Sequence, residues 1–232
     1  KKWEAEGFER AETKVYRAAW SRLAQDKVAV EVSFSLGGYS KYPILRGTAV
    51  WTVDGRGEIR LKVDAETREG LVYLPRFGLM LTMPPHNEEV EYFGWGPHEC
   101  YVDKRQSAKR GRYLTTVDEM YEPYIMPQEH GSRYGTEWAV VSNELGMGLR
   151  FEGGEPFSLN ASHYTPEDLT RAAHDYELVK RKETIVHIDF LMSGVGSNSC
   201  GPELMEKYRE YGKSIRAELS ILPVFKEDES GR

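Results

Sequence analysis

The first clear pattern in the chain is an alternation of apolar and polar positions between residues 28 and 36. Its apolar members fall on every second residue: Val28, Val30, Val32, Phe34 and Leu36. Because successive side chains of a strand point to opposite faces, this period predicts a strand buried on one face. Residues 50–53 and 59–63 lie on either side of Asp54-Gly55-Arg56-Gly57, where glycine allows the positive φ of a tight turn. They predict a hairpin.

A second hairpin is predicted in the middle of the chain. It runs from residues 138–141 through a turn at residues 143–146 to residues 149–151. Further strands are predicted at residues 157–161, 185–192 and 215–222. The 22 glycines, 11 prolines and 12% aromatic residues are typical of many short strands joined by tight turns.

Signals for helices are few. Thr165 is a good N-cap, Pro166 suits the first helical position, and Asp168 places a negative charge near the positive end of the helix dipole. These residues predict a short helix that ends near His174. Residues 202–211 predict a second helix with only a narrow apolar stripe. The patterns together predict an all-β fold, one large antiparallel β domain with one or two short helices.

The chain contains no internal repeat, low-complexity linker or break in composition, so residues 1–225 are predicted to form a single domain. An all-β sandwich can occupy this length as one domain. Residues 226–232 are polar and charged, and they predict a disordered tail. The 40% hydrophobic and 29% charged residues and a mean hydropathy of −0.59 are typical of a soluble globular protein.

Charge and cysteine content narrow the choice of partners and compartment. The net charge is −6, and the basic pairs at 104–105 and 109–110 are short, which argues against binding nucleic acid or an anionic membrane. No stretch approaches the roughly 18 apolar residues that cross a bilayer, and no apolar export signal follows the first residues. Cys100 and Cys200 are too far apart for a CxxC pair and too few for a disulfide framework. We expect reduced thiols in a cytoplasmic protein.

The densest run of unusual residues is 94–103, which combines turn formers, a large aromatic residue and two carboxylates. In a functional interpretation, Trp95 stacks on the apolar face of a sugar while Glu99 and Asp103 accept hydrogen bonds from its hydroxyl groups. In the structural alternative, the glycines allow a tight bend and Glu99 satisfies buried backbone donors.

Two further runs stand out. In residues 121–133, Glu129 and Arg133 are candidates for a charge-assisted pair that either grips a ligand or ties a long loop to the sandwich. In residues 189–202, a strand leads into a loop of small residues that carries Asn198, Ser199 and Cys200. Such a loop either lines a ligand cleft or simply connects two strands.

Signatures of catalysis or metal binding are missing from the sequence. The six histidines, at positions 86, 98, 130, 163, 174 and 187, show no HExxH or other metal-ligand spacing, so no metal site is predicted. There is no Gly-x-Ser-x-Gly elbow and no phosphate-binding glycine loop. Retaining glycosidases need two carboxyl groups about 5 Å apart. No neighbour pattern singles out such a pair.

Taken together, these runs resemble the C-terminal β-sandwich domain, or small-chain region, of family 2 β-galactosidases. The resemblance rests on three ordered motifs: Gly94-x-Gly96-Pro97-x-Glu99-x-Tyr101-x-Asp103; Asp118-x-Met120-Tyr121-x-Pro123-Tyr124 continuing through Pro127-x-Glu129-x-Gly131-x-Arg133; and Ile188-Asp189 leading to Gly194-Val195-Gly196. It covers residues 47–223, and the first 40 residues match only loosely.

The resemblance implies a large antiparallel β-supersandwich, similar to the galactose mutarotase fold. It also implies that the catalytic glutamates and the Mg²⁺ and Na⁺ sites lie in a TIM barrel absent from this chain. The chain would then be a fragment of a longer enzyme and inactive alone, with no catalytic residue and no cofactor of its own. In that family a loop Trp packs against the aglycone side of the substrate. This chain has Cys200 at that position, beside Asn198 and Ser199.

The leading expectation is therefore a domain of a cytoplasmic retaining β-galactosidase, which hydrolyses terminal β-D-galactosides. The domain would complete the substrate cleft and pack against the other domains of an oligomeric enzyme. Its expected substrate contacts are Trp95, Glu99, Asn198, Ser199 and Cys200. One alternative is a mutarotase-like aldose epimerase, in which His98 or His174 is the acid and Glu99 or Glu129 the base. Another is a non-catalytic interaction or carbohydrate-binding module.

Overall fold

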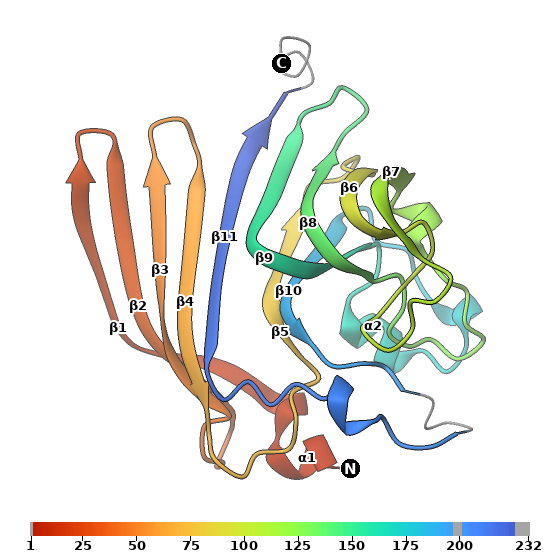
Figure 1. Ribbon diagram of the computed structural model, residues 1–232. Coiled ribbons are helices and arrows are strands. Elements are labelled where there is room, and N and C mark those ends of the chain that lie inside the picture. Colours follow the sequence, from red (N-terminus) through yellow and green to blue (C-terminus); the bar gives the residue numbers. More distant parts are fainter. Residues whose placement is uncertain (1, 197–200, 226–232) are drawn as a thin grey trace.

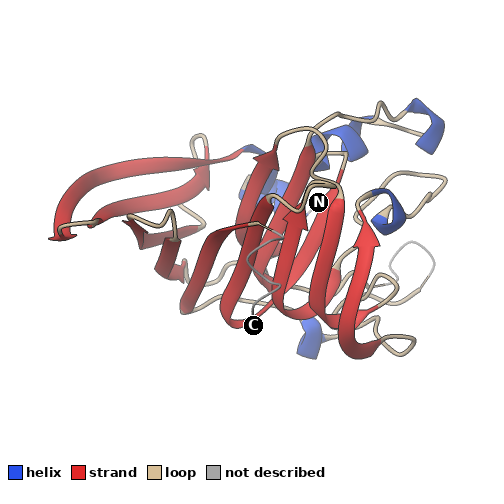
Figure 2. Cartoon of the chain, turned by 90° about the horizontal axis from the view of Figure 1, so that it is seen from above, coloured by secondary structure: helices blue, strands red, loops and turns tan. Residues whose placement is uncertain are grey.

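The computed structural model describes residues 2–196 and 201–225. Within these residues the chain forms one sheet of eleven strands, with short helical segments before β1 and in some of the connections (Figures 1 and 2). The strands are β1 (Ala11–Ala24), β2 (Lys27–Gly38), β3 (Leu45–Asp54), β4 (Ile59–Thr67), β5 (Arg76–Met83), β6 (Glu89–Gly96), β7 (Lys109–Thr116), β8 (Arg133–Ser142), β9 (Gly148–Ser162), β10 (Thr184–Met192) and β11 (Ile215–Val224). The helical segments are α1 (Lys2–Glu6), α2 (Pro166–Arg171) and the 3₁₀ turns η1 (Phe8–Arg10), η2 (Asp118–Met120), η3 (Asp175–Glu177) and η4 (Glu206–Tyr208).

All strand pairings in this sheet are antiparallel, which confirms the predicted fold class. The first four strands follow one another as a meander (Figure 1). The last strand, β11, then inserts between β4 and β9. The order continues through β8 and β6 to β7, while β10 pairs with both β9 and β5. The final strand therefore joins the N-terminal meander to the rest of the sheet.

A bend in β9 turns the sheet over the core. Its first part, up to Gly153, pairs with β11, whereas residues 158–162 pair with β10. The segment between them contains Gly153, Gly154 and Pro156, and a Cβ on Gly153 would lie 2.3 Å from the Glu155 carbonyl oxygen. Proline offers no N–H to a ladder, so regular pairing is interrupted here. The predicted strands 149–151 and 157–161 are thus parts of one bent strand.

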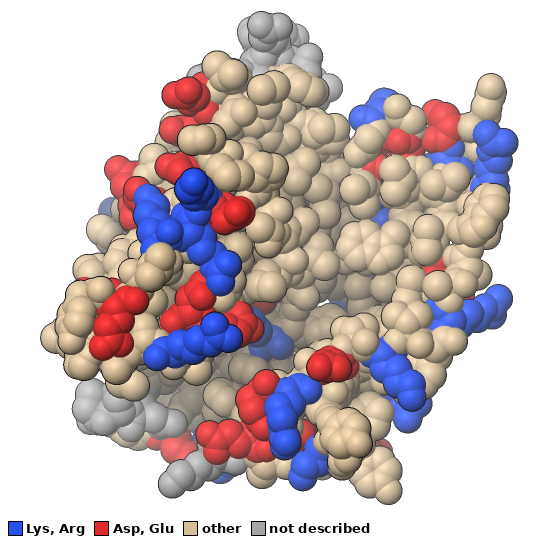
Figure 3. Space-filling view, turned by 180° about the vertical axis from the view of Figure 1, so that it is seen from behind, with Lys and Arg blue, Asp and Glu red and all other residues tan. Residues whose placement is uncertain are grey.

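The core lies on the inner face of the bent sheet. Its fully buried members come from both parts of the sheet and include Leu61 of β4, Phe151 of β9, Val186 of β10 and Leu219 of β11. Beside this core an apolar cleft of about 610 Å³ lies between β1–β4 and the strands β5 and β10. Seen from behind, the molecule is hollowed and most charged side chains lie on the rims (Figure 3).

The helix predictions are half right. Thr165 caps α2 as predicted: its hydroxyl accepts the Asp168 N–H at 3.2 Å, and Asp168 Oδ2 accepts the Thr165 N–H at 2.9 Å. The helix ends at Arg171 rather than near His174, because Ala172 is extended. Residues 202–211 form only the η4 turn, since Met205 and Arg209 are extended. No helix in the described residues is long and apolar enough to cross a membrane. The predicted tail, 226–232, lies outside the described residues.

Candidate functional site

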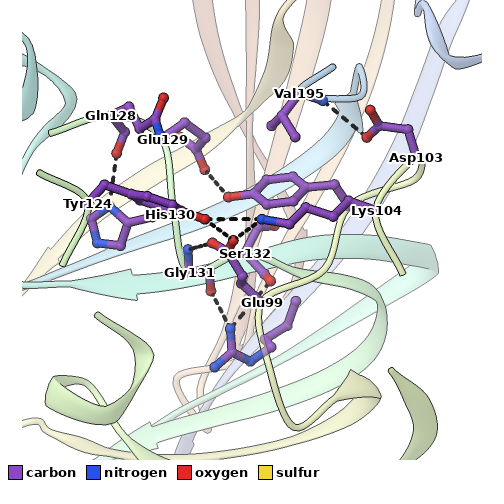
Figure 4. Close-up of polar contacts among 12 residues, drawn as sticks. Glu99, Asp103, Lys104, Tyr124, Gln128, Glu129, His130, Gly131, Ser132 and Val195 are labelled. Carbon is purple, nitrogen blue, oxygen red and sulfur yellow. Dashed lines mark hydrogen bonds and ion pairs between the residues drawn. The ribbon is translucent and has the colours of Figure 1, made fainter. Parts of the chain in front are cut away.

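The three sequence runs meet at one end of the sheet. We call the segments 94–104, 121–133 and 189–196, together with Arg76, the loop cluster (Figure 4). The first two segments are joined by their backbones, because the Cys100 N–H donates to the Ser132 carbonyl at 2.8 Å and Cys100 bridges to Arg133. The cluster therefore assembles residues that are far apart in the sequence.

Glu99 joins two segments of the loop cluster, 94–104 and 121–133. Its Oε2 accepts the Gly131 N–H at 3.0 Å, and its Oε1 accepts hydrogen bonds from Lys104 and Tyr124 (Figure 4). Burial raises the pKa of the Glu99 carboxyl, but these hydrogen bonds outweigh burial and hold the pKa below its usual value. The backbone of Gly131 approaches closely at φ +77°, where a Cβ would lie 2.5 Å from the Met120 carbonyl oxygen. Glu99 thus satisfies a buried backbone donor, as in the structural alternative; its contact with substrate stays a prediction.

Arg133, two residues after Gly131, is buried, with 2% of its surface exposed. Its Nη1 donates to the Gly131 carbonyl at 2.9 Å, and its Nε donates to the Tyr92 hydroxyl at 3.1 Å. Burial raises the pKa of Tyr92 to about 12, although Arg133 acts in the opposite direction. The predicted pair of Glu129 with Arg133 is wrong, because Arg133 serves the backbone of its own segment and Glu129 binds another arginine.

That arginine is Arg76 at the start of β5, which lies between two carboxylates. It donates to Glu129, and its Nη1 is 3.4 Å from Oδ2 of Asp189 in β10. The Tyr101 hydroxyl also donates to Glu129, at 3.4 Å. Asp189 is 4% exposed, and burial raises its pKa to about 7 even though Arg76 lowers it. The sequence analysis missed Arg76. One signal in the sequence does point to such a partner. Asp189 is the only acid in the apolar strand 185–192, and a buried acid needs a cationic or hydrogen-bonding partner.

Asp103 holds the third segment in place. Its carboxylate accepts the N–H groups of Val195 at 3.1 Å and Gly196 at 2.8 Å (Figure 4). Gly194 allows this approach, because a Cβ there would lie 2.5 Å from the Asp103 side chain. The candidates Asn198, Ser199 and Cys200, which follow this anchor in the sequence, lie outside the described residues. Their substrate contacts stay predictions.

Trp95 is half-buried, and its ring already has a cationic neighbour. The Arg105 guanidinium lies 5.4 Å from the centroid of the Trp95 ring and 5.1 Å from that of Tyr134. A cation at this distance is attracted by the electron-rich face of the indole. Stacking of Trp95 on a sugar stays a prediction.

The chemistry that this arrangement supports is that of a scaffold. Glu99 and Glu129 are each bound by cations and hydroxyl groups of the chain itself, so neither is poised as a free nucleophile or base. Among the described residues, three side chains of types that can bind metal ions also lie together outside the loop cluster: Glu88, Asp118 and His163.

Comparison with known proteins identifies the family. The family described as beta galactosidase small chain matches residues 1–221. The beta-galactosidase of Actinobacillus pleuropneumoniae is 38% identical over 220 residues, which cover 95% of this chain and 21% of that protein. The beta-galactosidase of Staphylococcus xylosus is 33% identical over 221 residues, covering 94% of this chain and 22% of that protein. The chain thus spans about a fifth of the length of these relatives.

Among solved structures, a GalM/aldose epimerase homologue from C. elegans has a TM-score of 0.41 and 13% identity, over 90% of this chain and 69% of the other. Galactose 1-epimerase from Lactobacillus acidophilus has a TM-score of 0.42 and 10% identity, over 90% and 66%. The sequence relationship is decisive: the chain belongs to the beta-galactosidase small chain family, a family of glycoside hydrolases.

Proposed function

With family membership as the premise, we propose that this chain is the small-chain domain of a retaining β-galactosidase and completes the substrate cleft of that enzyme. The catalytic carboxylates, with the Mg²⁺ and Na⁺ sites, belong to a TIM barrel in the rest of the protein. The main supporting observation is the pair of hydrogen bonds from Val195 and Gly196 to Asp103. They tie the segment that leads to Asn198, Ser199 and Cys200 to the loop cluster. An anchored loop presents side chains to a substrate in a defined position.

The domain alone is inactive in this proposal. Retaining hydrolysis needs a carboxylate nucleophile and a carboxylic acid about 5 Å apart. Glu99 accepts hydrogen bonds from Lys104, Tyr124 and Gly131, and Glu129 accepts them from Arg76 and Tyr101. Hydrolysis of an aryl β-galactoside is therefore expected only when this chain is combined with the barrel-containing chain. Hydrolysis by the domain alone would refute the proposal that the catalytic carboxylates lie outside this chain.

The rest of the enzyme is also the proposed partner of the N-terminal meander. Strand β1 pairs only with β2 in the sheet and exposes Val15, Trp20 and Leu23. Several large apolar side chains exposed on one strand are a feature of interaction sites. The relatives have nearly four-fifths of their length outside the matched region, which leaves ample protein to cover the meander.

We also propose a cytoplasmic location, because the buried Cys100 carries a free thiol.

The anchoring role of Asp103 is tested in the whole enzyme with Asp103→Asn. The amide oxygen accepts one N–H, but the amide NH₂ group opposes the other, so one charge-assisted hydrogen bond is lost. A loss of about 1–2 kcal/mol of positioning energy predicts a roughly 5- to 30-fold fall in kcat/KM for an aryl β-galactoside. Asp26→Asn, in the exposed turn between β1 and β2, is the matched control. Equal kinetics for the two variants would exclude the role proposed for Asp103.

Cys200→Trp separates a cleft residue from a pure interaction module. A residue that borders the aglycone changes KM or aglycone preference when it is replaced by Trp, whereas a module that only packs against its neighbours leaves the kinetics of the parent unchanged.

The epimerase alternative is tested by polarimetry on galactose anomers. In the structure, His174 Nδ1 lies 3.1 Å from Glu177 Oε1 rather than beside Glu99 or Glu129. We expect no acceleration of mutarotation by the chain.

A further inference from the structure

The three side chains of the metal-ligating group come together where strands end. Glu88 directly precedes β6, Asp118 begins η2 after β7, and His163 directly follows β9. Their ligand atoms all lie within 4.8 Å of one another. His163 Nε2 is 3.6 Å from Asp118 Oδ1 and 3.9 Å from Glu88 Oε1. Because the three residues are far apart in the sequence, no motif spacing reveals the group.

His163 is the most informative member, since its side chain is only 3% exposed. Its Nδ1 lies 3.0 Å from the Glu183 carbonyl oxygen. A carbonyl oxygen only accepts, so Nδ1 donates its proton to it, and the tautomer that this contact selects has its lone pair on Nε2. Among the described residues, the buried Nε2 has no hydrogen-bond partner. A lone pair on Nε2 beside the Asp118 and Glu88 carboxylates is an arrangement that a bound cation stabilises.

We infer that Glu88, Asp118 and His163 bind one divalent transition-metal ion of the Zn²⁺ class. Ligand nitrogen and oxygen atoms lie about 2.0–2.2 Å from zinc, so two ligand atoms of one ion are at most about 4.4 Å apart. The two distances from Nε2 satisfy this limit. The exposed Asp118 carboxylate, at 60%, has room to adjust. An imidazole ligand disfavours Mg²⁺ and Ca²⁺, which prefer oxygen donors.

The surroundings of His163 match those of a metal ligand. Histidines that bind metals usually donate their second ring N–H to a carbonyl or carboxylate oxygen, which fixes the tautomer and the orientation of the ring. The Glu183 carbonyl plays this part. The ion ties together the connections around β6, β7 and β9. It also supports the loop cluster, because Tyr164 packs against Tyr121 with ring centroids 5.4 Å apart.

Lys180 competes with the ion for Asp118. Its Nζ lies 2.6 Å from Asp118 Oδ1 and 2.7 Å from Oδ2. Its side chain is 46% exposed and is free to move into solvent when a metal ion binds. An opposing cation lowers the affinity of a carboxylate for metal. Removing the charge of Lys180 should therefore strengthen metal binding at this site. If Lys180 and Asp118 formed only a structural ion pair, the same change would not increase metal binding.

The test is zinc binding by the whole polypeptide that carries these residues, after treatment with a chelator. Zn²⁺, Mn²⁺ and Mg²⁺ are titrated separately, and bound metal is measured after equilibrium dialysis. We expect one additional zinc ion per chain compared with the His163→Gln variant, and only weak binding of Mg²⁺ at this site. At free zinc about 100-fold above Kd, we expect the unfolding transition of this domain to rise by roughly 5–10 °C.

Four variants sharpen the result. His163→Gln and Asp118→Asn should each weaken zinc binding by about 10- to 100-fold or more, and the exposed position of Asp118 makes its variant safe for folding. Lys180→Gln should strengthen binding roughly two- to fivefold, the range expected for removing one surface ion pair. Glu89→Gln, a neighbouring carboxylate outside the group, should bind as the wild type does. Equal zinc content in wild type, His163→Gln and Asp118→Asn would overturn the proposal, as would weaker binding by Lys180→Gln.

Discussion

The loop cluster and the β1–β2 hairpin differ in what holds them in place. In the loop cluster, charged side chains are buried and bound by several partners, as Arg133 and Glu99 show. In the hairpin, β1 is held mainly by its backbone ladder to β2, while Trp20 is 75% exposed. The loop cluster thus buries charged side chains, whereas the hairpin exposes apolar side chains along β1, the reverse of the usual distribution.

This contrast shows where the chain determines its own geometry and where it leaves a surface for others. A buried charge is costly unless paired, so the loop cluster tolerates few arrangements. Backbone pairing is indifferent to most side chains, so the outer face of β1 is free to be shaped by a partner. Substitutions in the two regions should therefore differ greatly in their effects on stability.

The largest effect is expected for Arg133→Met. The change leaves the Gly131 and Ser132 carbonyls and the Tyr92 hydroxyl without their buried donor. We expect the free energy of unfolding to fall by about 3–5 kcal/mol in urea denaturation. Arg216→Met, at a site that is 82% exposed, is the control and should cost less than about 0.5 kcal/mol. Similar losses of unfolding free energy in the two variants would contradict the contrast between the buried loop cluster and exposed positions.

Glu99→Gln should have the next largest effect, about 2 kcal/mol at neutral pH, because it weakens charge-assisted hydrogen bonds from Lys104 and Gly131. The pKa of Glu99 is lowered in the folded chain. Its contribution is therefore present above its unfolded pKa and is lost as pH falls through its folded pKa. The difference between wild type and variant should shrink in acid. The exposed Glu152→Gln is the control, and a difference that grows in acid would contradict this reasoning.

Two neighbours on β10 should show opposite pH effects. The pKa of Asp189 is raised from 3.8 to about 7, so its contribution to stability is lost as pH rises through this window. Burial lowers the pKa of His187 from 6.5 to about 4, so its contribution is lost as pH falls through that range. Each slope is at most about 1.4 kcal/mol per pH unit.

Replacing either residue leaves the pH dependence of stability that the other one contributes. With Asp189→Asn, the free energy of unfolding should rise with pH between about 4 and 6.5. With His187→Gln it should fall as pH rises toward 7. Urea denaturation across this pH range measures both. Parallel curves for the two variants would show that these groups do not titrate as described.

The smallest effect in the chain itself is expected for Trp20→Ser. The ring is exposed on β1, so the free energy of unfolding should change by no more than about 0.5 kcal/mol. If the rest of the enzyme covers this surface, the same variant should weaken association with the barrel-containing chain, measured by recovery of activity on mixing. Unchanged association would leave the hairpin without its proposed role.

The sequence predicts the local parts of this fold well. The hairpin of β3 and β4 is confirmed, because its pattern and turn lie within a few residues. The cap of α2 is confirmed because Thr165 and Asp168 are three positions apart. The helix predicted at 202–211 is wrong, since Leu204 is buried and Glu210 pairs with Leu74. These tertiary contacts outweigh a weak helical pattern.

The resemblance to the family rested on three motifs that contain Glu99, Asp103, Glu129 and Arg133. The structure brings these motifs together. The resemblance did not identify Arg76 as the partner of Glu129, because that choice depends on β5 lying beside β10.

By itself, the sequence determined the strand periodicity, the tight turns, the start of α2 and the family motifs, since each depends on residues close together along the chain. Only the tertiary structure decided that Asp103 anchors residues 195–196, that Arg76 lies between Glu129 and Asp189, and that Glu88 and Asp118 face His163. These pairs form because β9 bends and β10 pairs with both β9 and β5, which brings distant segments together. No local pattern encodes that proximity, because it arises only when the strands pair.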